Sequence, residues 1–521
     1  MGDQLDHRTQ ASEGLTWRPM AKHAGSVFSV DVTGLGKELG QPTHARIYER
    51  IRASIVSGSL SPNARLPSGR TLAKDFGVAR NTVDWALDQL VADGYIVRRR
   101  GAGSFVAAQL PERDASPVKP KRIAGSKQPI TSPPRLSQRA KALQSYPGHY
   151  RPLAPRPFLP SLPPIDLFPR EVWNRLLMTE AARSGDDYWA YGASNGLPAL
   201  REGIAAHASA MRATRCSPDQ IIVVTSTQQA VELAGKVLAD PGDRAWVETP
   251  GYQPVQHCLR AVGMQIVSVP VDEHGMDITA GRALEEHARL AYVTPAHQYP
   301  LGYEMSIARR TALLEWASER DAYIVEDDYD GDYRYEGRPI ASLQGMDDNG
   351  RVVYVGSFNK ILFPALRIAY VIAPEPLVGA FVDAKHTADG HTALLTQGAL
   401  AAFIHEGHLA RHLRKTRAIY DERRLSFLEE AKVLADVLDF GPARAGMHVT
   451  AIFKASKSPG LNDVAVAKAC LQEGVEVLPL SKFGATARGG LVFGFAIASR
   501  AATRSGLEVV RRAIARVAKE S

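Results

Sequence analysis

Cysteines are scarce and long apolar runs are absent in this chain of 521 residues, and acidic residues are fewer than basic ones. Its three cysteines, Cys216, Cys258 and Cys470, lie far apart, without the spacing of a disulfide framework or a cysteine metal site. No apolar run reaches the length of a membrane span, and the first residues lack the pattern of a signal peptide. We therefore expect a cytoplasmic protein with no membrane partner.

Acidic residues number 55 against 63 lysines and arginines, which gives a formal net charge of +8. This excess permits a polyanionic partner but does not prove one. The hydrophobic content of 45% and the charged content of 23% are ordinary for a globular protein. The chain is too long for one core, so two or three domains are expected.

The first quarter of the chain predicts a flexible tail followed by three helices. Residues 1–41 have no sustained periodicity. From residue 42 onward, three groups of apolar residues at helical spacing follow, and Ser68 is placed to cap the second helix. The turn around Gly77 separates the second and third helices, which predicts a helix-turn-helix. Three residues begin its second helix: Arg80, Asn81 and Thr82.

A basic hairpin is predicted directly after the third helix. Two short apolar strands flank a glycine-rich turn within residues 95–106. The turn region carries Arg98, Arg99, Arg100 and Gly101. An isolated charge run is usually a solvated face, but beside a helix-turn-helix we interpret this one as a wing that contacts DNA.

Residues 42–107 resemble the GntR family of winged helix-turn-helix regulators. The motifs that carry the resemblance are Leu66-Pro67-Ser68-x-Arg70-x-Leu72-Ala73, Arg80-Asn81-Thr82-Val83, Leu90-x-x-Asp93-Gly94-Tyr95 and Gly101-x-Gly103. The resemblance implies that double-stranded DNA is contacted by Arg70, Arg80, Asn81, Thr82 and Gly101. Asp84 stands where some members carry a DNA-contacting arginine, so no base contact is assigned to it.

Residues 108–145 have the composition of a tether. Six prolines interrupt helix formation, and eight lysines and arginines outnumber two acidic residues in this stretch. We predict a semi-extended, basic linker between the winged helix and the remaining residues 146–521.

The large C-terminal region alternates strand-like and helical patterns, which predicts an α/β domain with a mostly parallel sheet and helices on both faces. The predicted strands lie within residues 220–224, 245–247, 265–269, 290–293, 322–325 and 352–355. Ligands bind such sheets at the carboxyl ends of the strands, and polar groups follow several of these strands directly.

Each of these polar segments has a chemical and an ordinary interpretation. Ser226 and Thr227 open a helix, as a phosphate cradle or as a simple cap. Tyr252 suits stacking on a planar ring, or core packing. The four carboxylates within residues 326–330 suit a divalent metal or a cationic ring nitrogen. Lys360 is either a solvated loop lysine or an imine-forming amine.

This region resembles the fold-type I, aspartate aminotransferase-like enzymes, and the fusion resembles the MocR subfamily of GntR-type regulators. Among the matching runs are Pro250-Gly251-Tyr252, His297-Gln298-x-Pro300-x-Gly302 and Ser357-x-x-Lys360 with Pro364-x-x-Arg367. The resemblance implies pyridoxal 5'-phosphate (PLP) as cofactor and a smaller C-terminal α+β subdomain.

The roles that the resemblance implies are specific. Lys360 would form the internal aldimine, and Asp327 would pair with the pyridinium nitrogen. Tyr329 would bond the ring 3-hydroxyl, and Tyr252 would stack on the ring. The remaining cofactor residues are Ser226, Thr227, Ser357 and Arg367 on the phosphate, with His297 and Gln298 presented nearby.

The chain departs from the aminotransferase pattern at several positions. Asn359 replaces the usual serine before the lysine, and Ala296 and Leu301 replace small hydroxylated residues. Residues 490–496 are aliphatic or aromatic near the place of the arginine that grips the substrate carboxylate. Neither Arg444 nor Arg488 lies on that motif.

Three functions follow, in decreasing order of support. The first is a transcription regulator that senses an amino compound, or PLP itself, through an aldimine at Lys360. The second is a working aminotransferase with an accessory DNA-binding domain. The third is a metal-dependent enzyme using residues 326–330, which no histidine at ligand spacing supports. The resemblance also implies a domain-swapped homodimer that binds paired DNA half-sites.

Overall fold

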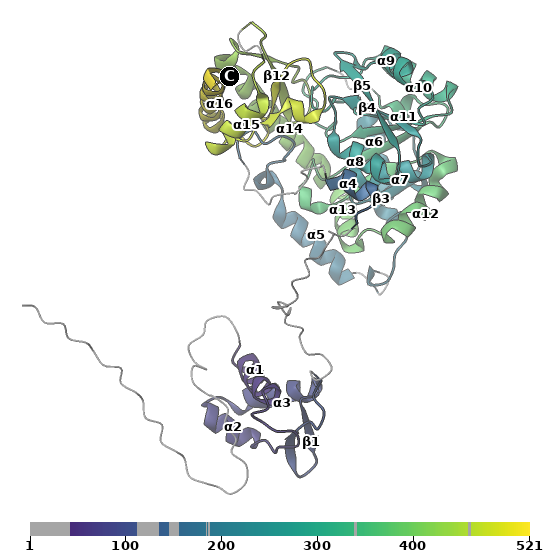
Figure 1. The fold of residues 1–521 in the computed structure, drawn as a ribbon. Helices are drawn as coiled ribbons and strands as arrows, with labels where there is room; N and C mark the ends of the chain where they lie inside the picture. The colour runs from purple at the N-terminus through teal and green to yellow at the C-terminus, as the bar shows by residue number, and fades with distance from the viewer. Residues whose placement is uncertain are drawn as a thin grey trace, which may run out of the picture. The chain divides into compact units, whose positions relative to one another are not determined.

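The computed structural model describes residues 42–111, 135–144, 156–183, 185, 188–337, 341–456 and 460–520. The predicted tail 1–41 and most of the predicted linker lie outside these ranges. The chain divides into two compact units, Met1–Pro133 and Pro134–Ser521 (Figure 1). None of the helices in the described ranges has both the length and the apolar character needed to cross a bilayer.

The first unit contains the three helices and the hairpin predicted from the sequence. Its elements are α1 (Thr43–Val56), α2 (Gly69–Phe76), α3 (Arg80–Ala92), β1 (Ile96–Arg99) and β2 (Gly103–Val106). Ile47, Ile51 and Ile55 are buried on the inner face of α1 and pack against the apolar face of α3. The Ser68 hydroxyl accepts a hydrogen bond from the Thr71 amide at 3.2 Å, which caps α2 as predicted.

An eight-stranded sheet forms the centre of the second unit, in the order β3-β10-β9-β8-β7-β4-β5-β6. Strands β5, β4, β7, β8 and β9 are parallel, whereas β10 is antiparallel to both β3 and β9. The strand bounds are β3 (Ile221–Val224), β4 (Arg244–Thr249), β5 (Gln265–Asp272), β6 (Gly275–Met276), β7 (Leu290–Val293), β8 (Tyr323–Asp328), β9 (Val352–Ser357) and β10 (Ala369–Ile372). All six predicted strands are present, and β6 and β10 were not predicted.

Helices cover this sheet. They are α5 (Arg170–Arg183), α6 (Pro198–Arg212), α7 (Thr227–Leu238), α8 (Gln253–Ala261), α9 (Ile278–Leu284), α10 (Ile307–Glu319), α11 (Leu343–Met346), α12 (Val378–Asp389) and α13 (Leu394–His405). Separate apolar clusters lie against the strands; one joins β3, β4, β7, β8 and β9 to α7, α8 and α12. Another joins α5, α6 and α13 to the segment that carries Lys360.

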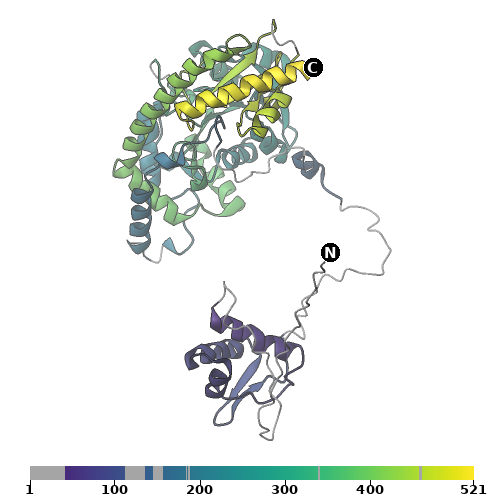
Figure 2. The same ribbon diagram turned by 90° about the vertical axis from the view of Figure 1, so that its left-hand side faces the viewer.

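A second, antiparallel sheet forms the C-terminal subdomain, in the order β11-β12-β14-β13. Its elements are α14 (His408–Glu430), β11 (Leu438–Phe440), β12 (His448–Phe453), α15 (Asp463–Gln472), β13 (Leu478–Pro479), β14 (Gly490–Gly494) and α16 (Arg500–Glu520). Figure 2 shows α16, in yellow, lying across the small sheet, where Leu507, Val510 and Ile514 are buried. The α+β subdomain expected from the resemblance is therefore present.

The end of the predicted linker differs from the prediction. Residues Gln138–Gln144 form a helix, α4, which packs against α8 in the second unit. The Ser137 hydroxyl accepts a hydrogen bond from the Ala140 amide at 3.1 Å and starts this helix. No proline occurs between Pro134 and Pro147, so the residues that were predicted to stay extended are free to form a helical turn.

Candidate functional site

Eight of the ten predicted cofactor residues line a single cavity of about 680 Å³ at the carboxyl ends of the parallel strands. They are Ser226, Thr227, Tyr252, Asp327, Tyr329, Ser357, Lys360 and Arg367. They come from four stretches of the sequence: residues 226–227, 252, 327–329 and 357–367. The strands deliver them to one edge because the parallel strands of the sheet end on the same side.

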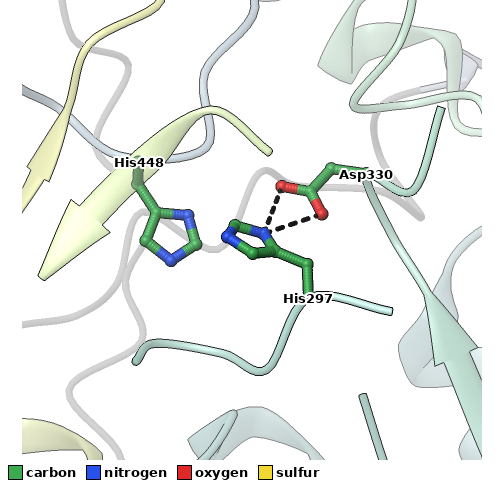
Figure 3. Close-up of side chains that lie close together, drawn as sticks. All are labelled: His297, Asp330 and His448. Carbon is green, nitrogen blue, oxygen red and sulfur yellow. Dashed lines mark hydrogen bonds and ion pairs between the residues drawn. The ribbon is translucent and has the colours of Figure 1, made fainter. Parts of the chain in front are cut away.

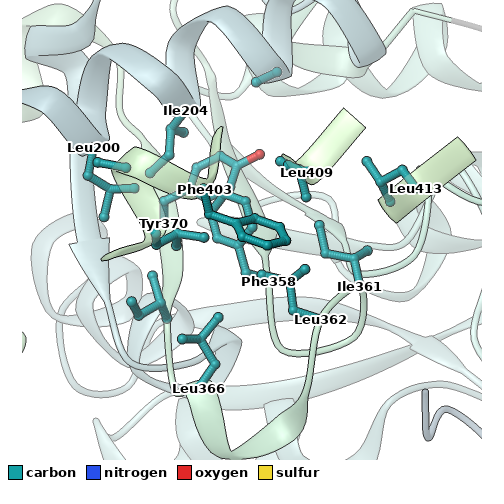
Figure 4. Close-up of a cluster of buried hydrophobic side chains, with 14 of the residues drawn as sticks. Leu200, Ile204, Phe358, Ile361, Leu362, Leu366, Tyr370, Phe403, Leu409 and Leu413 are labelled. Carbon is teal, nitrogen blue, oxygen red and sulfur yellow. The ribbon is translucent and has the colours of Figure 1, made fainter. Parts of the chain in front are cut away.

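Lys360 is held by a rigid segment after β9. Phe358, Ile361, Leu362 and Leu366 on either side of it are buried in the apolar cluster that joins α6, α13 and α14 (Figure 4). The Lys360 ammonium donates a hydrogen bond to the Ser161 carbonyl oxygen at 3.0 Å. Burial lowers the pKa of Lys360, against the opposing effects of Asp330 and Asp327. A lower pKa increases the neutral fraction, which is the nucleophilic form of the amine.

Asp327 presents one unsatisfied oxygen to the same cavity. Its Oδ2 accepts a hydrogen bond from the Tyr292 hydroxyl at 2.5 Å. Its Oδ1 is buried and has no hydrogen-bond partner among the described residues. Burial raises the pKa of this carboxyl to about 7. A cationic N–H donor at Oδ1 would satisfy the oxygen and favour the charged carboxylate.

The other three carboxylates after Ile324-Val325 have partners of their own. Glu326 accepts the Leu343 and Gln344 amides, each at 2.9 Å. Asp328 forms a buried ion pair with Arg212 and accepts the Tyr354 hydroxyl at 2.9 Å. Because side chains alternate along β8, Glu326 and Asp328 lie on the face opposite Asp327. The four carboxylates therefore do not form one metal site; the fourth, Asp330, lies instead beside His297 and His448, with ligand atoms within 4.8 Å of one another.

The phosphate side of the cavity is built around the start of α7. Ser226 caps this helix, and its hydroxyl accepts the Gln229 amide at 3.2 Å. The exposed Arg367 follows a short 3-10 turn and has a positive φ of 54°. Helix amides, hydroxyls and a guanidinium are the groups that bind phosphate.

Asn359 links three of the cavity's segments, and its role was not predicted. Its Oδ1 accepts the Ile368 amide at 3.2 Å, and its Nδ2 donates to the Thr225 carbonyl at 3.5 Å. It thus connects the Lys360 segment to the Arg367 turn and to the loop before α7. The sequence showed only that asparagine replaced the usual serine, since both partners lie outside its own motif.

Aromatic rings surround the remaining side of the cavity. Tyr299 packs edge to face against Tyr252 and Tyr329, with ring centroids 5.9 and 5.8 Å apart. Gly251 precedes Tyr252, and a Cβ atom there would lie 2.3 Å from the Glu248 carbonyl oxygen. Glycine is therefore required for the turn that delivers Tyr252 to the cavity.

His297 and Gln298 are not among the residues that line the cavity; they lie behind it. The Nδ1 atom of His297 lies 3.1 Å from each carboxylate oxygen of Asp330. The Tyr329 hydroxyl donates a hydrogen bond to the His297 carbonyl oxygen at 3.0 Å. Gln298 donates to the Pro250 carbonyl at 2.9 Å. These two residues support Tyr329 and the Tyr252 turn from behind.

His448, on β12, joins His297 and Asp330 in a buried cluster (Figure 3). The His448 Nε2 lies 3.1 Å from the Pro300 carbonyl oxygen, so this nitrogen carries the proton. Nε2 of His297 and Nδ1 of His448 have no hydrogen-bond partners within the described part of the chain. No sequence pattern indicates this cluster, because His448 comes from the other sheet.

The predicted DNA-contacting residues are all in the first unit and are mostly exposed. Arg70, Asn81 and the wing residues Arg100 and Gly101 are exposed, and Thr82 is half-buried. Three arginines also have contacts within the protein. Arg80 pairs with Asp84 at 3.2 Å, Arg98 pairs with Asp88 at 2.6 Å, and Arg99 lies 4.7 Å from the Phe105 ring centroid.

Comparison with known proteins matches both units to families. Residues 168–500 match the aminotransferase class I and II family, and residues 43–106 match the gntR family of bacterial regulatory proteins. The chain is 37% identical over 483 residues to the probable rhizopine catabolism regulatory protein MocR of Rhizobium meliloti, covering 92% of this chain and 95% of that protein. It is 29% identical to the pyridoxine biosynthesis transcriptional regulator PdxR of Corynebacterium glutamicum, covering 86% and 91%.

Solved structures match the second unit. The kynurenine aminotransferase of Pyrococcus horikoshii, in complex with PMP, has a TM-score of 0.64 and 26% identity, covering 74% of this chain and 95% of that one. The α-aminoadipate aminotransferase LysN of Thermus thermophilus, complexed with N-(5'-phosphopyridoxyl)-L-leucine, has the same TM-score and identity, covering 70% and 93%. The chain therefore belongs to the MocR-like transcriptional regulators, in which a GntR-type winged helix-turn-helix precedes an aminotransferase class I and II domain.

Proposed function

We propose that this chain regulates transcription by binding DNA through its winged helix and by holding PLP at Lys360, where an amino compound is sensed. The observation that carries the cofactor assignment is that Lys360 and Asp327, whose Oδ1 has no hydrogen-bond partner among the described residues, line the same cavity. An amine for the aldehyde and an acid for the ring nitrogen are the two groups that this cofactor requires.

The other residues of the cavity have matching roles. Tyr252 would stack on the ring, and Tyr329 would bond the ring hydroxyl. The phosphate is held by Ser226, Thr227, Ser357 and Arg367. When bound, the cofactor supplies an electrophilic carbon and an electron sink. Lys360 provides the covalent attachment, and Asp327 keeps a proton on the ring nitrogen.

DNA binding is assigned to residues 42–107. Arg70, Arg80, Asn81 and Thr82 contact DNA from α2 and α3, and residues 98–101 contact it from the wing. Residues 108–145 tether this domain to the cofactor domain, residues 146–521. A domain-swapped homodimer would present two winged helices to paired half-sites, and a cytoplasmic location gives the regulator access to DNA.

Effector binding acts on DNA binding only if the effector has different affinities for two states of the protein. The names of the relatives refer to different processes, rhizopine catabolism and pyridoxine biosynthesis, so they do not identify this effector. A working aminotransferase is the second candidate, and the 26% identity to kynurenine aminotransferase supports it.

Visible absorbance of the purified protein tests the cofactor assignment. Protein incubated with PLP and freed of excess should show a visible band that Lys360→Ala lacks or displaces. Lys432→Ala, at an exposed lysine that does not line the cavity, serves as a matched control and should keep the band. The assignment is wrong if Lys360→Ala and the wild type have the same spectrum. Multiple-turnover conversion of an amino donor with a keto acid would favour the aminotransferase.

A further inference from the structure

We infer that the compound recognised above Lys360 is a primary amine without a carboxylate, its other groups being neutral. This inference deepens the proposed function and rests on PLP being held at Lys360. It concerns the charge and shape of the cavity wall on the side away from the phosphate site.

The described lining of the cavity offers no cation to pair with a carboxylate on the effector. Among the described residues that line it, the cations are Lys360 and Arg367, and the one carboxylate is Asp327. Lys360 is used for the covalent attachment, and Arg367 is assigned to the phosphate. A carboxylate on the effector would therefore be buried without an opposite charge, which is strongly unfavourable.

An apolar wall occupies the side where a gripping cation would be needed. Tyr299 and Leu478 line the cavity, and they pack against a buried cluster of Leu301, Leu480, Phe483 and Val492. Leu478 on β13 pairs directly with Val492 on β14. Val492 is fully buried, so this strand delivers an aliphatic side chain behind the cavity wall.

The two arginines considered from the sequence for this role, Arg444 and Arg488, lie elsewhere. The Arg444 side chain is 75% exposed, and its Nε is 3.9 Å from Glu336. The Arg488 guanidinium lies 3.5 Å from the Phe453 carbonyl oxygen and does not line the cavity. Neither is placed to pair with a carboxylate above Lys360.

Neutral polar groups supply the remaining lining. Ser161, Gln228 and Thr294 line the cavity, and the Ser161 hydroxyl is buried with no hydrogen-bond partner among the described residues. Hydroxyl and amide groups suit uncharged substituents, because hydrogen bonds satisfy such substituents on burial whereas a carboxylate also needs a cation. The cavity therefore favours an amine over the amino acid that carries the same side chain.

Matched pairs of compounds test this inference. The PLP-loaded full chain is titrated with ethanolamine and serine, with phenethylamine and phenylalanine, and with isopentylamine and leucine, while its visible spectrum is followed. For each compound, the half-saturation concentration with the protein is divided by the half-saturation concentration of the same compound with free PLP. This ratio removes differences in intrinsic amine reactivity. We expect at least one amine to saturate at a concentration at least ten-fold lower, on this scale, than its amino acid. An equal or tighter response to the amino acids overturns the inference.

A charge introduced into the wall provides the second arm. Leu478→Arg should shift the preference at least ten-fold toward the amino acid, whereas Leu478→Gln, its neutral control of similar length, should not. A variant enters the comparison only if its visible band is retained. An unchanged preference in Leu478→Arg with the band intact overturns the inference. If the wild type has no band that depends on Lys360, the proposed function fails instead, so the two failures are distinguishable.

Discussion

Replacing Asp327 with asparagine should stabilise the cofactor-free protein at pH 8, although it removes a residue that the cofactor needs. In the cofactor-free cavity the carboxyl is buried, and one of its oxygens has no partner among the described residues. Its pKa rises from about 3.8 to about 7 for this reason. A raised carboxyl pKa stabilises the folded state below about pH 4, and this contribution is lost as the pH rises through about 7.

The size of the effect follows from the pKa shift. A shift of about 3 units corresponds to about 4 kcal/mol at alkaline pH. Asparagine keeps an acceptor for the Tyr292 hydroxyl but leaves its own amide without a partner, which costs about 1–3 kcal/mol. The net stabilisation at pH 8 is therefore about 1–3 kcal/mol. For a domain of roughly 390 residues, about 2 kcal/mol raises the melting temperature by about 2–3 °C.

Thermal unfolding of cofactor-free protein at pH 5 and pH 8 measures this difference. Asp327→Asn should melt above the wild type at pH 8, and this advantage should be smaller at pH 5, where the carboxyl of the folded wild type is still protonated. Adding PLP should reverse the order at pH 8, because only the carboxylate pairs with a protonated ring nitrogen. A variant that melts below the cofactor-free wild type by the same amount at both pH values would refute the reasoning.

Two further predictions concern the DNA surface and the cavity. Asp84→Asn should raise DNA affinity about 3- to 10-fold, because it frees Arg80 and removes a negative charge from the surface. The slope of log affinity against log salt concentration should become steeper by about one unit. Fluorescence anisotropy over a salt series measures this, and an unchanged affinity would mean that α3 does not face the phosphates. Asn359→Ala should weaken PLP binding about ten-fold without loss of helical content, because it disconnects three segments of the cavity. Equilibrium dialysis and circular dichroism check both parts, and full PLP affinity in the variant would contradict the linking role.

The positions of the cavity residues could be predicted from the sequence where strand ends determine them. Ser226, Asp327 and Ser357 lie within two residues of the carboxyl ends of β3, β8 and β9, and parallel strands end at a common edge. The separation of Glu326 and Asp328 from Asp327 also follows from the two-residue period of a strand.

Contacts between distant segments could not be predicted in this way. Ser161, which accepts the hydrogen bond of Lys360, lies before the first strand of the sheet. His448 comes from the small sheet, and no sequence periodicity relates it to His297. Helix α4 is not predicted because six prolines precede it, although none lies within it.

The most direct test of the account is the effect of an effector on DNA binding with and without Lys360. An operator selected from random DNA with the PLP-loaded wild type is titrated with wild type and with Lys360→Ala, each in the presence and absence of a saturating amine from the spectral titration. We predict that the amine changes the operator affinity of the wild type at least five-fold and leaves that of Lys360→Ala unchanged. The same amine-dependent change in both proteins would contradict a switch that operates through Lys360.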